Sequence, residues 1–197
     1  MAQIVGRQAP EFALDGVLNG RFSTYRLADY KGKWVVLFFY PLDFTFVCPT
    51  EILAFSDRLG EFKKLNCEVL GASVDSKFSH LAWTEKPREE GGIKSLAYPL
   101  LEDLGKDLSK AYGVLDEQGR IALRGLFIID PDGIVQHVTI NNTAVGRSVD
   151  ETLRVLAAFQ RVRDHGELCP ADWKPGARVM KAGDRENAKE FFATTAR

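Results

Sequence analysis

Residues 34–40 read WVVLFFY, an unbroken apolar run that is too short to span a bilayer. A short run that is apolar at every position is typical of a strand buried on both faces of a sheet. A second apolar run, CEVLGASVD, occupies residues 67–75, and residues 49–64 between the two repeat apolar side chains at helical spacing. Such a strand–helix–strand unit predicts a parallel pair joined by a right-handed crossover.

The rest of the chain continues this alternation. We expect a helix at 77–89 that ends near Pro87, a short edge strand at 97–103, a hairpin at 126–140 with Pro-Asp-Gly at its turn, and a helix at 148–166. The order β-α-β-α-β-β-α predicts an α/β protein with a mixed central sheet flanked by helices. This arrangement suits the thioredoxin-like class of folds.

The last predicted helix has clear start and stop signals. Ser148 and Glu151 form a capping box before it, and Gly166 can end it. Beyond Gly166 the composition becomes polar and is broken by prolines. We therefore predict one domain over residues 1–166 and a C-terminal tail over residues 167–197, with one short helix near the end of the chain.

Composition narrows the possible functions. The formal net charge is −1, which gives no sign of binding to nucleic acid or to an anionic membrane. No glycine-rich phosphate loop and no CxxC pair occur, and the 3 histidines are scattered, so we expect no cofactor and no metal. No leader pattern is visible, so we expect a cytoplasmic protein. The odd count of 3 cysteines argues against a structural disulfide framework.

Cys48 stands where the first buried strand gives way to a helix. Pro49 suits the first helical position, which puts Cys48 at about the N-cap. Free backbone N–H groups and the helix dipole stabilise an anion there, and the thiolate is the nucleophilic form of cysteine. The Thr45 hydroxyl can donate to the thiolate and accept from a peroxide O–H. The alternative, a small buried hydrophobe, is our interpretation of Cys67, which begins an apolar strand without a cap.

The stretch FYPLDFTFVCPTEI resembles the peroxidatic motif of the peroxiredoxins, Pro-x-x-x-Thr-x-x-Cys, with Pro41, Thr45 and Cys48 in place. NCEVLGASVDSKFSHLAW, RGLFIIDPDG, VGRSVDETLRVLAAFQ and CPADW resemble the typical 2-Cys subgroup, which includes the bacterial alkyl hydroperoxide reductase C-type enzymes. The resemblance implies a thiol-dependent peroxidase that reduces hydrogen peroxide and alkyl hydroperoxides. It also implies that Pro41 shields the site from water and that Thr45 is the hydroxyl partner.

The resemblance assigns further roles around the thiol. Cys48 attacks the peroxide and becomes a sulfenic acid, and Arg124 stabilises the thiolate and orients the peroxide. Glu51 and Arg147 match the residues that anchor Arg124 in an ion network. Without the resemblance, Arg124 is an ordinary surface arginine before a strand, Glu51 a complement to the helix dipole, and Arg147 a solvated residue before a capping box.

Cys169, in CPADW, matches the resolving cysteine of the same subgroup. The family pairs Cys48 of one chain with Cys169 of the other, which makes a homodimer the implied functional unit. A disulfide requires Cα atoms within about 7 Å, so we expect the first helical turn to unwind and the tail to rearrange. Taken alone, Cys169 is equally well an incidental surface thiol.

Partners follow from the resemblance as well. Residues 75–83, DSKFSHLAW, resemble the segment through which dimers associate into a ring, with Phe78 as an apolar anchor or, alternatively, packed within its own subunit. The implied reductant is thioredoxin or a dedicated flavoprotein disulfide reductase. The rival functions are a redox-controlled holdase chaperone or peroxide-sensing relay protein, and a general disulfide reductase, which the missing CxxC disfavours.

Overall fold

The computed structural model describes residues 3–195, and the chain divides into two compact units, residues 1–147 and residues 148–197. The boundary between the units lies at the start of the helix predicted at 148–166. The division predicted after residue 166, which separates a peroxidase domain from a tail, stays a prediction. Within the described residues, no helix combines the length and the apolar character that crossing a bilayer requires.

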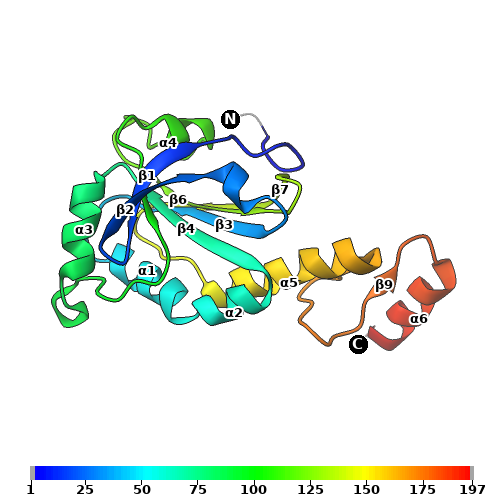
Figure 1. Ribbon diagram of the computed structural model, residues 1–197. Helices are drawn as coiled ribbons and strands as arrows, with labels where there is room; N and C mark the ends of the chain where they lie inside the picture. Colours follow the sequence, from blue (N-terminus) through cyan, green and yellow to red (C-terminus); the bar gives the residue numbers. More distant parts are fainter. Residues whose placement is uncertain (1–2, 196–197) are drawn as a thin grey trace. The chain divides into compact units, whose positions relative to one another are not determined.

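The first unit is built on one seven-stranded sheet with the order β2-β1-β5-β4-β3-β6-β7 (Figure 1). Its strands are β1 Ala13–Leu18, β2 Arg21–Arg26, β3 Trp34–Phe39, β4 Cys67–Ser73, β5 Leu100–Glu102, β6 Arg124–Ile129 and β7 Val135–Asn141. β4 runs parallel to both β3 and β5, whereas the other neighbours are antiparallel. This is the mixed, thioredoxin-like sheet that the sequence predicted.

The hairpin of β6 and β7 is confirmed, and its turn contains Pro131, Asp132 and Gly133 as predicted. The Asp130 carboxylate accepts hydrogen bonds from the backbone N–H groups of Asp132 and Ile134, each at 2.9 Å. Gly133 has a φ of 83°, in the region that favours glycine. Local turn chemistry therefore sets the register of this hairpin.

The prediction of an edge strand at 97–103 is wrong. β5 pairs with β4 on one side and with β1 on the other, so it lies inside the sheet. The outer position is taken by the hairpin of β1 and β2, which we did not predict. β2 reads RFSTYR and is exposed at every position except Tyr25, so it lacks the alternation that reveals a half-buried strand.

The helices of the first unit are α1 Cys48–Asp57, α2 Leu59–Lys64, α3 Lys77–Glu85 and α4 Asp107–Ala111, with 3-10 turns at Leu27–Tyr30 and Arg88–Glu90. The single helix predicted at 49–64 is therefore two helices, because Arg58 between them has φ −105° and ψ 12°. The helix predicted at 77–89 ends at Glu85, before Pro87. We did not predict α4, because five residues are too few to show a helical period.

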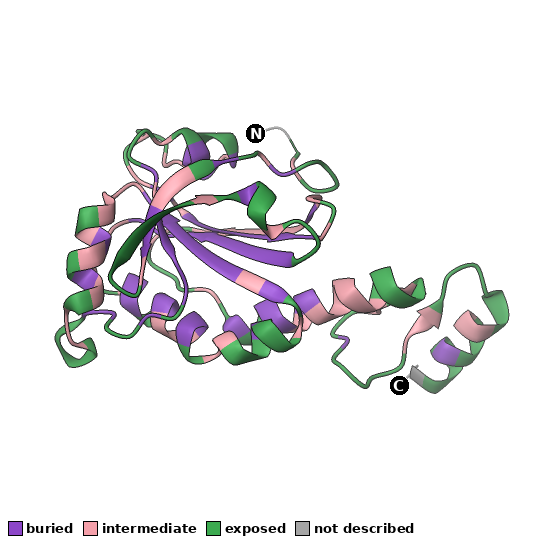
Figure 2. Ribbon diagram, in the orientation of Figure 1, coloured by how far each residue is buried: buried purple, intermediate pink, exposed green. Residues whose placement is uncertain are grey.

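Side chains of β3 alternate between the two faces of the sheet, and both faces are covered. On one face Phe38 stacks on Phe55 of α1, with ring centroids 4.9 Å apart. On the other face Phe39 packs against the ring of Tyr112, which follows α4, with centroids 5.5 Å apart. Every residue of β3 is buried, as the colouring of the central strands shows (Figure 2). The strand that leads to α1 is therefore held from both sides.

The second unit contains α5 Val149–His165, β8 Glu167–Leu168, β9 Met180–Lys181 and α6 Arg185–Thr195. Ser148 Oγ accepts from the backbone N–H of Glu151 at 3.1 Å, and Gly166 ends α5 with a φ of 65°, so the predicted start and stop of this helix are confirmed. The short helix near the end of the chain is confirmed as well. The antiparallel pair of β8 and β9 was not predicted, because strands of two residues carry no periodicity.

Candidate active site

Cys48 is the first residue of α1, and Val47 takes the N-cap position that we predicted for Cys48. The Cys48 side chain is fully buried. Pro49 follows in the first turn, where a missing N–H costs no hydrogen bond. Because the helix starts beyond the end of β3, the thiol lies past the carboxyl end of a central strand. Open α/β sheets form their active sites at such ends.

Arg124 is the first residue of β6 and is only 2% exposed. β6 runs antiparallel to β3, with Leu126 opposite Phe38, so the start of β6 lies beside the end of β3. Arg124 Nη1 lies 3.5 Å from Cys48 Sγ, and its Nε donates to the Thr143 carbonyl at 2.8 Å. The sheet register thus brings together a cation and a thiol that are far apart in sequence.

Glu51 joins two arginines in a buried network. Its Oε2 accepts from Arg124 Nη1 at 2.5 Å and from Arg147 Nη2 at 3.0 Å, and its Oε1 accepts from Arg147 Nε at 2.7 Å. All three side chains are at most 3% exposed. Two guanidinium groups and one carboxylate leave one positive charge without a partner, and a Cys48 thiolate would neutralise it. A buried charge is costly when unpaired, so the network favours an anion at this place.

Further contacts that we did not predict hold Arg147, among them donation from its Nη1 to the Gly125 carbonyl at 2.5 Å. The Arg147 backbone N–H also donates to Glu51, at 2.7 Å, and a Cβ on the preceding Gly146 would lie 3.3 Å from Glu51 Cγ. The Arg147 guanidinium lies 5.2 Å from the centroid of the Phe38 ring, a cation–π contact. The sequence signal for these contacts was Gly146, which precedes Arg147. Nothing in the pattern of β3 marks Phe38 as the partner of an arginine.

Thr45 and Pro41 lie on the connection between β3 and α1. Thr45 is partly buried, and its hydroxyl donates to the Leu42 carbonyl at 2.9 Å. The hydroxyl proton is therefore engaged, and the oxygen lone pairs are left to accept a hydrogen bond. Donation from Thr45 to Cys48 stays a prediction. Pro41 is buried and follows Tyr40, the first residue after β3.

A buried polar cluster anchors the same connection to α3. The Asp43 carboxylate accepts from the Tyr40 hydroxyl at 2.9 Å and from the Ser79 hydroxyl at 2.8 Å, and it lies 2.8 Å from His80 Nδ1. The Asp43 backbone N–H donates to Asp75 at 2.9 Å. Burial, followed by the nearby charge of Asp43, raises the pKa of Asp75. Sequence reasoning missed this cluster, since its members come from separate elements.

Cys67 begins β4 and is also buried, with 1% of its surface exposed. Its Sγ lies 3.5 Å from the Glu68 carbonyl oxygen, to which the thiol donates weakly. Burial raises the pKa of the Cys67 thiol far above its usual range. This environment keeps the thiol neutral and agrees with the structural role predicted for it.

Cys169 lies in the second unit, directly after β8, and is partly exposed. Its thiol donates to the Ala158 carbonyl of α5 at 3.7 Å. Partial burial raises the pKa of Cys169, and the nearby Arg161 acts in the opposite direction. The thiol is therefore held in its unit by one weak bond, which is easily broken.

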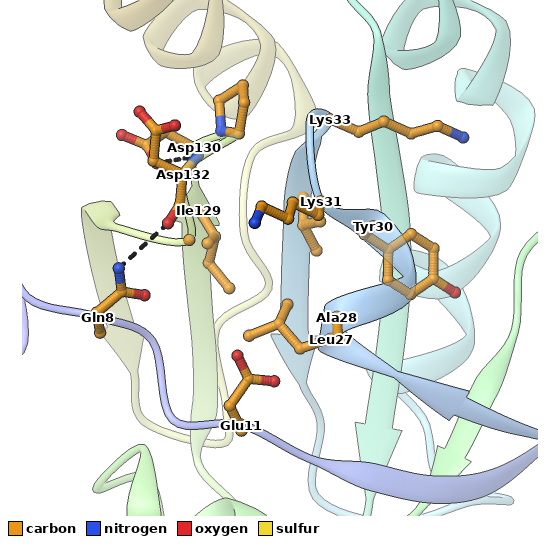
Figure 3. A pocket seen from close by; sticks show the side chains of 13 residues that line it. Gln8, Glu11, Leu27, Ala28, Tyr30, Lys31, Lys33, Ile129, Asp130 and Asp132 are labelled. Carbon is orange, nitrogen blue, oxygen red and sulfur yellow. Dashed lines mark hydrogen bonds between the residues drawn. The ribbon is translucent and has the colours of Figure 1, made fainter.

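A pocket of about 330 Å³ opens at the opposite end of β3 and β6 from Cys48 (Figure 3). Val35 and Ile129, which are register partners, contribute apolar surface, and the side chains of Glu11 and Lys31 extend toward the hollow. Gln8 donates to the Asp132 carbonyl at 3.2 Å along one wall. Because this pocket contains no thiol, it is separate from the candidate active site.

Family comparisons cover both units. The model described as the AhpC/TSA family matches residues 5–138, and the model described as the C-terminal domain of 1-Cys peroxiredoxin matches residues 158–194. Peroxiredoxin-2 of Bos taurus is 59% identical over 189 residues, which are 96% of this chain and 94% of that protein. The chloroplastic 2-Cys peroxiredoxin BAS1 of Hordeum vulgare is 58% identical and covers 96% of this chain and 90% of its own length.

Comparison with solved structures points to the same family. The reduced 2-Cys peroxiredoxin of Plasmodium vivax superimposes with a TM-score of 0.93 at 44% identity, over 97% of this chain and 99% of that one. The mitochondrial 2-Cys peroxiredoxin of Plasmodium falciparum gives a TM-score of 0.79 at 45% identity, over 84% of this chain and 99% of that one.

Proposed function

The chain belongs to the AhpC/TSA family and is a 2-Cys peroxiredoxin, a thiol-dependent peroxidase, and from this premise we propose that Cys48 is the residue that attacks the peroxide. One observation carries the assignment: Arg124 Nη1 lies 3.5 Å from Cys48 Sγ, in a buried network with one positive charge in excess. The Cys67 thiol donates to a backbone carbonyl, and Cys169 donates to a carbonyl of α5, so neither is bonded to this network.

The first step is oxygen transfer to sulfur. The Cys48 thiolate attacks one oxygen of a hydroperoxide, the O–O bond breaks, and an S–O bond forms. The second oxygen leaves with the bonding electron pair and takes a proton, so the products are a sulfenic acid and water or an alcohol. Hydrogen peroxide and alkyl hydroperoxides both fit this step.

Arg124 stabilises the thiolate before attack and the negative charge that develops on the leaving oxygen. Its guanidinium is planar and offers several donors in a fixed arrangement. Glu51 and Arg147 are positioning residues, because Glu51 bonds both guanidinium groups and fixes the direction of Arg124. Donors fixed before the reaction need no reorganisation during it.

Thr45 and Pro41 complete the site. The Thr45 hydroxyl donates to Leu42 and keeps its lone pairs free, so it accepts a hydrogen bond from the peroxide O–H. Pro41 has no N–H to hydrate, and its burial keeps water from the thiolate. The peroxide is thereby placed between a hydrogen-bond acceptor, the Thr45 hydroxyl oxygen, and the hydrogen-bond donors of Arg124.

Resolution uses Cys169 of a partner subunit. The Cys169 thiolate attacks the sulfenic sulfur of Cys48, an S–S bond forms, and the hydroxide that leaves takes a proton to become water. Cys48 is fully buried at the start of α1, so a second sulfur reaches it only after the first turn unwinds. A dithiol reductant then cleaves the disulfide by exchange. We propose thioredoxin for this role, with a flavoprotein disulfide reductase as the alternative.

The sheet offers an edge for a homodimer. β7 is an outer strand, and its sequence, VQHVTIN, contains no lysine, arginine or carboxylate. The opposite edge, β2, begins with Arg21 and ends with Arg26. Charged edge strands resist pairing with another chain, and uncharged ones accept it. We therefore propose that two copies pair through β7.

A second surface suits assembly of dimers into a ring. Phe78 is 64% exposed and Phe22 is 41% exposed, and their rings meet edge-on at 5.3 Å. Lys77 Nζ lies within 6 Å of both ring centroids, at 5.6 Å and 5.9 Å. Replacing Phe78 by Glu should leave dimers alone in light scattering of the reduced protein, whereas the parent chain should be larger.

The assignment is tested by single-turnover oxidation followed on non-reducing gels. The parent chain should consume one equivalent of peroxide and give a dimer band, and Cys169→Ser should react once without the band. A band that persists in Cys169→Ser contradicts the resolving role.

Assays that cross thioredoxin and a flavoprotein reductase with several peroxides identify the reductant. Client protection that survives in Cys48→Ser would reveal a separate holdase activity. The cytoplasmic location stays a prediction for cell fractionation.

A further inference from the structure

A buried tyrosine is bonded to the backbone of the helix that begins with Cys48. Tyr98 is 2% exposed, and its hydroxyl donates to the Ile52 carbonyl at 2.7 Å. Ile52 lies one helical turn beyond Cys48 in α1. The Tyr98 ring packs edge-on against Phe38 of β3, with centroids 5.8 Å apart. A rigid, buried donor therefore ties α1 to the segment that leads into β5.

Neighbouring residues tie the same segment to the same helix. The Ala97 backbone N–H donates to Ser56 Oγ at 3.1 Å, and Arg88 Nη1 donates to Asp57 Oδ1 at 2.9 Å. These two bonds reach the last turn of α1, whereas the Tyr98 bond reaches the turn next to Cys48. Among the ties from residues 88–98 described here, the Tyr98 hydroxyl is therefore the one placed to resist unwinding that begins at Cys48.

We propose that Tyr98 is a positioning residue that holds α1 folded and thereby sets the fate of the Cys48 sulfenic acid. This inference rests on the proposed function, in which Cys48 forms the sulfenic acid and Cys169 resolves it. While α1 is folded, Cys48 is buried and only a small molecule reaches it. A second hydroperoxide then transfers an oxygen to the sulfur, its O–O bond breaks, and sulfinic acid and an alcohol or water result. Once the turn opens, Cys169 attacks and water leaves.

The chemistry of the hydroxyl suits this role. Burial raises the pKa of Tyr98 well above its usual range, so the group stays a donor across the working pH of the protein. When α1 unwinds, water can replace the Tyr98 hydroxyl as the hydrogen-bond donor to the Ile52 carbonyl. Removing the hydroxyl therefore weakens the folded state of the helix without adding an unpaired donor.

Tyr112 provides a matched control. It is also 2% exposed, its hydroxyl donates to the Pro10 carbonyl at 3.0 Å, and burial raises its pKa too. Its ring contacts Phe39 and Phe127, on the face of the sheet opposite Phe38. Tyr112→Phe thus removes an equivalent bond that does not involve α1.

The experiment uses the full chain as Tyr98→Phe, Tyr112→Phe and parent. Stopped-flow oxidation by hydrogen peroxide gives the rate of the first step, and mass spectrometry during turnover gives the ratio of Cys48–Cys169 disulfide to Cys48 sulfinic acid. Tyr98→Phe should keep the first rate within about twofold and raise the ratio about fivefold, the factor that corresponds to about 1 kcal/mol for one hydrogen bond. Tyr112→Phe should change neither.

The outcomes separate this inference from the proposed function. A disulfide-to-sulfinic ratio in Tyr98→Phe that is unchanged, lowered, or raised equally by Tyr112→Phe overturns the role of Tyr98. A slowed first step in Tyr98→Phe also overturns it, since the hydroxyl would then act on the reacting site. Failure of the parent chain to oxidise at Cys48 overturns the proposed function instead.

Discussion

Cys48 and Cys67 are both buried thiols, and they lie at opposite ends of the same pair of strands. Cys67 begins β4 and pairs in register with Trp34 at the start of β3, whereas Cys48 follows the end of β3. Their exposed fractions are 0% and 1%. Burial therefore does not distinguish the two thiols, so a difference in their reactivity must come from the groups that surround each sulfur.

The surroundings differ in charge. Cys48 Sγ lies 3.5 Å from Arg124 Nη1, so a cation faces the thiol, and Cys48 begins a helix, whose positive dipole end favours an anion. Cys67 Sγ donates to a backbone carbonyl, and burial dominates the rise of its pKa. A thiol that is merely buried is inert, and a thiol buried beside an unneutralised cation is prepared to react.

The largest effect tests the comparison directly. Cys48→Ser should lower peroxide consumption by more than about 10³-fold, since the nucleophile is lost. Cys67→Ser, the matched control at the other end of the strands, should keep the parent rate within about twofold. Both are measured as single-turnover oxidation rates with hydrogen peroxide. Oxidation of Cys48→Ser at the parent rate would contradict the assignment.

The next change makes the surroundings of Cys48 more like those of Cys67. Arg124→Gln should lower kcat/KM by about 10²- to 10³-fold, because the charged donor beside the sulfur is lost. Arg124→Lys should recover part of the loss, since it keeps the charge but not the planar set of donors. Circular dichroism verifies that both variants fold. Activity of Arg124→Gln within tenfold of the parent would show that the cation is not what separates the two thiols.

How much of the fold could be predicted from the sequence depends on the kind of pattern that each strand or helix carries. The runs at 34–40 and 67–75 are long and apolar, and they gave the correct parallel pair. β2 was missed because an exposed edge strand has no buried face to read, and β5 was misplaced because its second neighbour, β1, comes from the unpredicted hairpin. Tertiary pairing, not local pattern, decides such positions.

The candidate site shows the same division. The pattern of Thr45, Cys48 and Pro49 is local, so these residues themselves pointed to a reactive thiol, whereas Pro41 was assigned through the family resemblance. Arg124 and Arg147 came only from the family resemblance, because the antiparallel register of β3 and β6 brings Arg124 to the thiol. The Asp43 cluster and the Tyr98 bond had no signal, since each joins groups from separate elements.

A smaller effect concerns stability. Cys67→Ser should lower the free energy of unfolding by about 1–3 kcal/mol, because a buried hydroxyl replaces a weakly polar thiol. The same variant should leave kcat/KM unchanged. Urea denaturation of the reduced protein measures the first quantity and a steady-state assay the second. A loss of turnover in a variant that remains folded would show that Cys67 takes part in the chemistry.

The smallest effect is a dependence of stability on pH that belongs to Cys67. Burial raises the pKa of Cys67 in the folded chain, whereas a thiol in an unfolded chain titrates at about 8.5. Below that pH both states hold the proton, and the contribution of the buried neutral thiol is fully present.

Above about pH 8.5 the unfolded chain loses the proton that the folded chain keeps, so the free energy of unfolding falls by up to about 1.4 kcal/mol per pH unit. Cys67→Ala lacks this titration, and the remaining residues are the same in both proteins. The stability difference between parent and Cys67→Ala should therefore shift steadily against the parent from about pH 8.5 to 10. Urea denaturation with a reductant at each pH measures it. A difference that stays constant across this range would mean that the folded chain does not hold Cys67 as a neutral thiol, and the contrast with Cys48 would lose its physical basis.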